Sequence, residues 1–161
     1  MPNVLFLSRR NSLRSQLAEA TLRKIGGSRF RVHSCGVPGS VQPVVSPIAL
    51  ATLQKAGIPI DDLHTKSWSE FVRLRNSKLD YVITLDDSIP LAHPVWPGQP
   101  ELALWHYPDI DDVGAQIKVL APQVTKMLLS MQHRLELLVQ LCSRATVRRE
   151  IRDDLRDLGR T

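Results

Sequence analysis

Residues 4–20, VLFLSRRNSLRSQLAEA, place a short apolar run directly before a polar loop and an amphipathic helix pattern. The four residues from Val4 to Leu7 are too few for a helix and are typical of a strand buried on both faces. The helix is expected to begin at Ser15. A strand, a loop and a helix in this order favour a fold built on a parallel sheet, and backbone N–H groups at a helix N-terminus predict a site for a tetrahedral oxyanion.

The rest of the chain repeats this alternation of strands and helices. Strands are expected over residues 3–7, 29–34, 79–87 and 101–107, and helices over 15–27, 46–57 and from 67 onward. This order predicts an α/β fold with a four-stranded parallel sheet and helices on both faces, in three αβα layers. At 161 residues the chain suits one domain, covering 1–161.

The C-terminal part is helical in character from Asp111 to Ser143, and Pro122 is expected to begin a new segment or to kink the helix. Apolar residues recur there at steps of three and four, which predicts core packing. They are Val124, Met127, Met131, Leu135, Leu138 and Cys142. The tail over 145–161 alternates charges and is expected to form a solvated helix, with a partner-binding segment as the alternative.

Composition excludes several classes of protein. No apolar run is long enough for a signal peptide or a membrane span, so a cytoplasmic protein without membrane contact is expected. Cys35 and Cys142 show no paired spacing, which argues against a disulfide framework and a metal site, and no cofactor is implied. The positive charge is concentrated over residues 9–31, which hold a single aromatic residue, Phe30. Nucleic acid is therefore a poorer partner than a small anion or a phosphorylated protein.

The loop over residues 8–15 resembles that of the low-molecular-weight protein tyrosine phosphatases and of the thioredoxin-linked arsenate reductases that share their fold. Their loop reads Cys, five residues, Arg, then Ser or Thr. Asn11, Ser12, Arg14 and Ser15 match it, while Ser8 stands where the family has its cysteine. Further motifs of the family follow in order along the chain: HSCG, KAGIPID, HTKS, DYVITLDD and LWHYPDID.

The resemblance assigns roles to particular residues. Ser8 takes the position of the nucleophile, Arg14 that of the anion-binding arginine and Asp109 that of the general acid, although Ile110 replaces the proline that follows this acid in the family. The oxyanion-binding residues that it implies are Ser8, Arg9, Arg10, Asn11, Ser12, Leu13, Arg14 and Ser15.

Ser8 changes the chemistry that such a loop can perform. A hydroxyl ionises far less readily than a thiol and needs an adjacent base, which the loop itself does not offer. His93 and His106 are expected to be surface or packing residues rather than that base. We therefore expect binding of phosphate, sulfate or arsenate-type anions with little or no turnover, because Arg14 and the backbone N–H groups remain.

Arsenate reduction is not expected. The resemblance places the two further cysteines of the thioredoxin-linked relay at Asp86 and His93, so that all three relay cysteines are absent. Cys35 is expected to be a buried small side chain. A metal site at Asp86 and Asp87 is not favoured, because adjacent residues of a strand point to opposite faces.

Three interpretations remain. The first is a phosphatase-like pseudoenzyme that binds oxyanions or a phosphorylated partner. The second is an active phosphatase of phosphotyrosine or other phosphomonoesters, in which an engineered Ser8 replaces the cysteine. The third is a scaffold or nucleic-acid-binding protein with a basic surface. Arg9 and Arg10 either add positive potential at the mouth of the loop or are simply solvated. The physiological ligand and the oligomeric state stay open, and specificity is expected to come from residues 37–45 and 87–110.

Overall fold

The computed structural model describes residues 1–73, 78–91, 94–112, 116–144 and 148–160, and these ranges contain a four-stranded sheet. Its strands are β1 (Asn3–Leu7), β2 (Arg31–Cys35), β3 (Tyr81–Thr84) and β4 (Glu101–Leu104). The spatial order is β2-β1-β3-β4, and all three pairings are parallel. The predicted α/β fold with a four-stranded parallel sheet is thus confirmed.

Strand β1 lies in the middle of the sheet, as its unbroken apolar sequence predicted. Val4 and Phe6 pack into the core on one face, and Leu5 and Leu7 pack into a second core on the other face. All four side chains are at most 1% exposed. A strand covered on both faces needs apolar residues at every position, which is why this short run carries no alternation.

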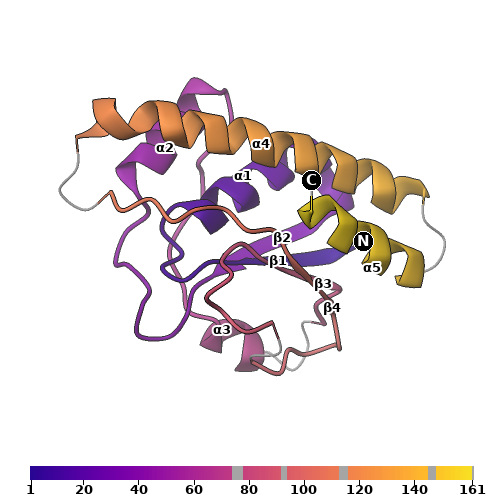
Figure 1. Ribbon diagram of the computed structural model, residues 1–161. Helices are drawn as coiled ribbons and strands as arrows, with labels where there is room; N and C mark the ends of the chain where they lie inside the picture. Colours follow the sequence, from indigo (N-terminus) through magenta and orange to yellow (C-terminus); the bar gives the residue numbers. More distant parts are fainter. Residues whose placement is uncertain (74–77, 92–93, 113–115, 145–147, 161) are drawn as a thin grey trace.

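Helices cover both faces of the sheet (Figure 1). The face with α1 (Arg14–Gly26) and α2 (Pro47–Lys55) also carries α4 (Ile117–Arg144) and α5 (Arg148–Gly159), whereas α3 (Ser69–Arg73) lies on the opposite face. A 3₁₀ turn, Gly27–Arg29, joins α1 to β2. This is the expected three-layer arrangement. In the described residues, none of the helices is long and apolar enough to cross a membrane.

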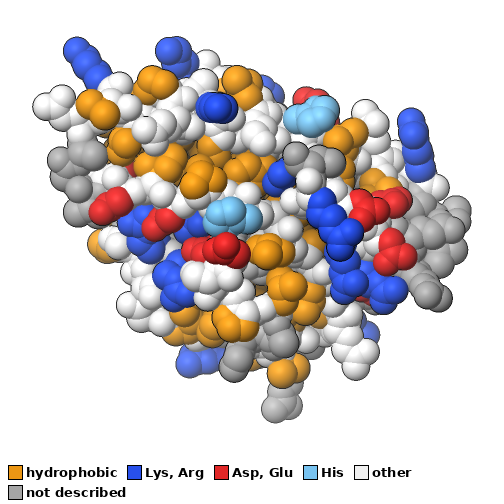
Figure 2. Space-filling view, in the orientation of Figure 1, with side chains coloured by type: hydrophobic (Ala, Val, Ile, Leu, Met, Phe, Trp, Pro, Cys, Tyr) orange, Lys and Arg blue, Asp and Glu red, His pale blue; other side chains and the backbone are white. Residues whose placement is uncertain are grey.

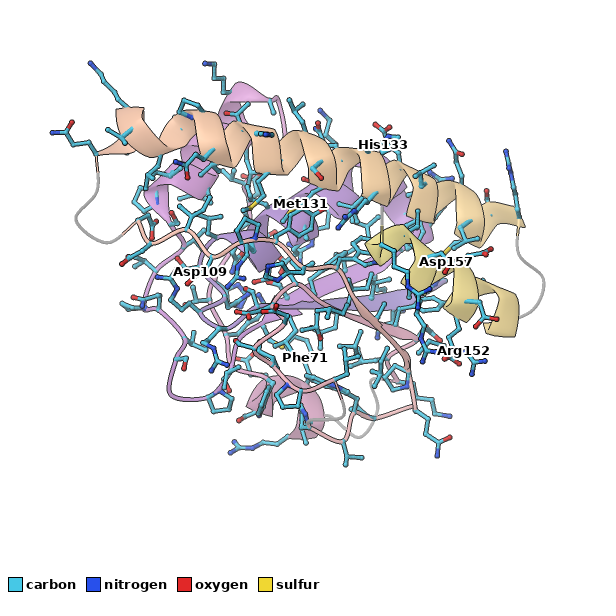
Figure 3. The ribbon with its side chains drawn as sticks, in the orientation of Figure 1. Phe71, Asp109, Met131, His133, Arg152 and Asp157 are labelled. Atoms are coloured by element: carbon cyan, nitrogen blue, oxygen red, sulfur yellow. The ribbon has the colours of Figure 1, made fainter. Side chains whose placement is uncertain are left out.

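The apolar stripe of α4 forms part of the larger core, as predicted. Val124 and Leu138 are fully buried, and Met131 points from α4 towards the interior (Figure 3). Pro122 was expected either to begin a new segment or to kink the helix, and the first alternative is wrong, because α4 already begins at Ile117 and runs through the proline. Five residues of α4 precede Pro122, and the missing N–H removes a single hydrogen bond of the helix.

The tail forms a helix, α5, but it is not the solvated helix that was expected. Ile151 and Leu155 lie one turn apart and are buried against β4 and α4. The indole N–H of Trp105 donates a hydrogen bond of 3.0 Å to the carbonyl oxygen of Leu155. Charged residues such as Asp157 lie on the outer side of α5 (Figure 3).

Strands β3 and β4 end earlier than the sequence predicted. The chain leaves β3 after Thr84 and β4 after Leu104, so the residues that follow form loops rather than strand. Because the strands are parallel, these loops and the loop after β1 meet at the same edge of the sheet. The candidate site is assembled at this edge.

Candidate functional site

The backbone of the loop between β1 and α1 turns its carbonyl groups to the surrounding chain. The carbonyl oxygens of Arg9, Arg10, Ser12 and Leu13 accept hydrogen bonds of 2.9–3.0 Å from the N–H groups of Val37, Gln42, Ser46 and Leu17. The N–H groups of residues 9–15, in contrast, donate to no group in the described part of the chain. Unpaired N–H groups in a loop that leads into the N-terminus of a helix form an environment suited to a tetrahedral anion.

Asn11 fixes the shape of this loop. Its backbone has a positive φ of 51°, a conformation that asparagine tolerates better than most residues. The side-chain amide donates to the hydroxyls of Ser15 at 2.8 Å and Ser34 at 2.9 Å, and its oxygen accepts the N–H of Lys66 at 2.8 Å. Asn11 is completely buried, so these bonds satisfy its amide and hold the loop against β2 and the segment after α2.

Gly36, directly after β2, allows a second chain segment to approach the loop. A Cβ atom at this position would lie 2.9 Å from the carbonyl oxygen of Arg9 and 3.0 Å from the Cβ of Asn11. The N–H and carbonyl of Gly36 also pair with the carbonyl of Lys66 and the N–H of Trp68, both at 2.9 Å. Any larger residue would push these segments apart, which explains the glycine in the HSCG motif.

A buried ionic cluster of Glu19, Lys66 and Arg23 lies next to the residues that hold Asn11. The Glu19 carboxylate is completely buried on α1 and lies 3.3 Å from the ammonium group of Lys66. Lys66 also donates to the carbonyl of His64 at 2.9 Å, and the Ser34 hydroxyl donates to Glu19 at 2.6 Å. Arg23 closes the cluster at 2.7 Å from the second Glu19 oxygen. The cluster is not predictable from the sequence, because Glu19 and Lys66 lie in separate motifs with no spacing that joins them.

Ser8 lies at the base of the loop and is 2% exposed. Its hydroxyl oxygen is 2.6 Å from that of Ser15, and either group is able to donate. Among the described residues, no histidine or carboxylate is hydrogen-bonded to Ser8. His106 lies 3.6 Å from Asp87 instead, and His93 falls outside the described residues. The structure thus offers Ser8 no base within reach in its described part.

Arg14 begins α1, one residue earlier than the sequence predicted, and its side chain is 4% exposed. The guanidinium group donates to Asp86 at 2.9 Å and to the carbonyl oxygen of Tyr107 at 3.0 Å. The Asp109 carboxylate lies 3.3 Å away. The loops after β3 and β4 therefore fix the orientation of this cation at the edge of the sheet.

Asp86 is the carboxylate that holds Arg14 in place. Burial raises the pKa of Asp86, but hydrogen bonds from the hydroxyl and N–H of Ser88, together with the Arg14 guanidinium, outweigh burial and hold the pKa below its usual value. The neighbouring Asp87 faces His106 rather than Asp86. In the ranges that the structure describes, no group of three or more His, Cys, Asp or Glu side chains is arranged to hold a metal ion.

Asp109 lies on the loop after β4 (Figure 3), where the general acid was expected, and its side chain is 57% exposed. One carboxylate oxygen accepts a hydrogen bond of 2.6 Å from Arg10, which also donates to the carbonyl of Ile110 at 3.0 Å. Arg10 is therefore not a free solvated cation, since its charge is paired. Figure 2 shows acidic and basic side chains gathered on this part of the surface.

Comparison with known proteins shows which family has this sequence pattern. Residues 3–93 match the family described as low molecular weight phosphotyrosine protein phosphatase. The chain belongs to this family. The family resemblance predicted from the motifs is thereby confirmed.

Several relatives of this family member are arsenate reductases. A glutaredoxin arsenate reductase from Synechocystis sp. is 29% identical over 117 residues, covering 73% of this chain and 85% of the relative. An arsenate reductase from Brevibacillus brevis is 28% identical over 130 residues, covering 73% and 92%. The solved structure of an arsenate reductase in the phosphate binding state superimposes with a TM-score of 0.67 at 28% identity, covering 87% of this chain and 98% of that one.

Neither of the two cysteines of this phosphatase-family chain belongs to the 8–15 loop. Cys35 ends β2, is completely buried, and its pKa is raised by that burial, as expected for a small packed side chain. Burial also raises the pKa of Cys142, on α4, to about 11. Both thiols are therefore protonated at neutral pH, and neither supplies a thiolate nucleophile.

Proposed function

We propose that the loop over residues 8–15 binds phosphate-type oxyanions, namely phosphate, sulfate, arsenate or the phosphoryl group of a phosphorylated protein, with little turnover of phosphate esters. One observation carries the proposal: the N–H groups of residues 9–15 have no hydrogen-bond partner in the described part of the chain, while the loop carbonyls are paired with the surrounding backbone. A tetrahedral anion accepts hydrogen bonds from several such groups at once. A similar arsenate reductase whose structure is described as phosphate-binding supports the same ligand class.

Arg14 is the principal cation of the proposed site. Its contacts with Asp86 and the Tyr107 carbonyl orient the guanidinium before a ligand arrives, which reduces the entropy lost on binding. Charge-assisted hydrogen bonds from an oriented guanidinium are about twice as strong as neutral ones. The proposed role of Arg14 is thus to hold the anion over the N-terminus of α1.

The proposed lack of turnover follows from the residue at the base of the loop. In the family pattern a cysteine thiolate attacks phosphorus there, whereas this chain has Ser8. Among the described residues, the hydroxyl of Ser8 is hydrogen-bonded only to another hydroxyl, that of Ser15, which is no stronger a base. Asp109 takes the position of the family's general acid, which protonates the leaving oxygen when the nucleophile attacks phosphorus. Without attack by Ser8, Asp109 has no leaving group to protonate. We accordingly infer a pseudoenzyme of the phosphatase family.

Arsenate reduction by a cysteine relay is outside this proposal. Position 86 carries an aspartate that is hydrogen-bonded to Arg14 and Ser88, and position 8 carries a serine. Arsenate then acts only as a ligand, because its reduction needs electrons that no thiol at the loop supplies.

Hydrolysis of para-nitrophenyl phosphate tests the proposed lack of turnover. The parent chain, Ser8→Cys and Ser8→Ala are compared side by side under reducing conditions. We expect turnover only in Ser8→Cys, because a thiolate is the one missing component. Parent activity comparable to that of Ser8→Cys, and lost in Ser8→Ala, would show that Ser8 is a working nucleophile and contradict the proposal.

A further inference from the structure

Arg9 differs from the other cations at the mouth of the loop. Arg10 pairs with Asp109, and Arg14 pairs with Asp86. Arg9 forms no ion pair with any described carboxylate and donates instead to the hydroxyl and carbonyl oxygens of Ser88 at 2.9–3.2 Å. Its charge is thus held in place without being neutralised by a direct acidic partner.

A short hydrogen-bonded chain connects Arg9 to the proposed oxyanion site. The Ser88 hydroxyl accepts from Arg9 and donates to Asp86 at 2.6 Å, and the other Asp86 oxygen accepts from Arg14 at 2.9 Å. One hydroxyl and one carboxylate therefore separate the two guanidinium groups. Both arginines also belong to the same loop, so their relative positions are fixed by side chains as well as backbone.

The guanidinium of Arg9 retains the capacity to bind a ligand. Its Nε and Nη2 atoms donate to Ser88, while Nη1 has no partner among the described residues. The side chain is only partly buried, so a group entering from solvent is able to reach it. A planar guanidinium with free N–H donors is well suited to a carboxylate.

We propose that Arg9 forms a second anion subsite beside the oxyanion loop, so that the preferred ligand is a phosphorylated residue flanked by acidic side chains. This inference rests on the proposed function and specifies its ligand class. The phosphoryl group occupies the 8–15 loop while a neighbouring carboxylate pairs with Arg9. Of the three arginines in the loop, Arg9 is the one without a described carboxylate partner, and its charge is therefore available for this contact.

Calorimetric titration with two phosphotyrosine peptides tests this subsite. One peptide carries aspartate on both sides of the phosphotyrosine, and the other carries asparagine at the same positions. We expect the parent chain to bind the aspartate peptide roughly threefold to tenfold more tightly. Arg9→Gln is expected to remove this preference. Arg31→Gln is the control, because it removes the same charge from an exposed position at the start of β2 and should retain the preference.

The possible outcomes separate the subsite from the proposed function. Equal affinity of the parent for both peptides, with phosphotyrosine binding intact, would overturn the Arg9 subsite and leave the oxyanion site standing. An equal loss of preference in Arg9→Gln and Arg31→Gln would assign it to bulk charge and also overturn the subsite. Failure of both peptides and of inorganic phosphate to bind would overturn the proposed function itself.

Discussion

Replacing Lys66 with methionine is expected to lower the free energy of unfolding by about 3 kcal/mol. The Lys66 side chain is 5% exposed, and its partner Glu19 is fully buried at 3.3 Å. Removing one member of a buried ion pair costs roughly 3–5 kcal/mol, because the remaining charge is desolvated and unpaired. The lower end applies, since Arg23 and Ser34 still contact Glu19. In a chain of this length the loss corresponds to a fall in Tm of about 6–12 °C.

Urea unfolding at neutral pH, followed by circular dichroism, measures this effect in a double-mutant cycle. Lys66→Met, Glu19→Gln and the double variant are compared with the parent, and the double variant should lose less stability than the sum of the two single variants. Lys55→Met is the control, because Lys55 is exposed on α2 and its loss should change stability by about 0.5 kcal/mol or less. A Lys66→Met variant as stable as this control, or additive single effects, would refute the reasoning.

Three further predictions concern other parts of the molecule. Because the folded-state pKa of Asp86 is lowered, its ionised form stabilises the fold above the ordinary pKa of about 4, and this contribution is lost as pH falls through the folded-state pKa. The stability gap between parent and Asp86→Asn, measured by urea unfolding, should therefore shrink on acidification, and a constant gap would contradict this role. Ellman's reagent at pH 8 should modify Cys35 far more slowly in the folded protein than in urea, since the thiol is buried and its pKa is raised; equal rates would contradict the burial. Leu155→Ala should cost roughly 2–5 kcal/mol in thermal or urea unfolding, and Leu129→Ala, at a 61% exposed position, about 0.5 kcal/mol or less. Similar small losses in both leucine variants would mean that α5 does not contribute to the core.

The layers of the fold were predictable because their signals are local. The unbroken apolar run of β1, the two glycines at the end of α1 and the periodic stripe of α4 each depend on a few neighbouring residues. The alternation of strands and helices then limits the connections to a parallel sheet. The prediction failed for the environment of α5, because two apolar residues in a charged segment do not reveal that Ile151 and Leu155 pack against β4 and α4.

The side-chain contacts of the candidate site were harder to predict from the sequence than the layers of the fold. Arg14 and Asp109 were expected near each other from the family resemblance, but the partner of Arg14 with the shorter contact is Asp86, 72 residues away. Arg10 meets Asp109 across 99 residues, and Lys66 meets Glu19 across 47. Such pairs depend on which loops meet at the carboxyl edge of the sheet, and no residue spacing encodes that meeting.

The measurement that tests the central claim most directly is a calorimetric titration with inorganic phosphate at two chloride concentrations. The parent chain is compared with Asp86→Asn and with the double variant Arg14→Ala, Asp86→Asn, so that the loss of Arg14 leaves no buried carboxylate unpaired. Circular dichroism verifies that each variant is folded. We predict one saturable site in the parent and in Asp86→Asn, and none in the double variant. Equal binding by all three proteins, weakening steeply with salt, would contradict the loop as the site and indicate a general basic surface instead.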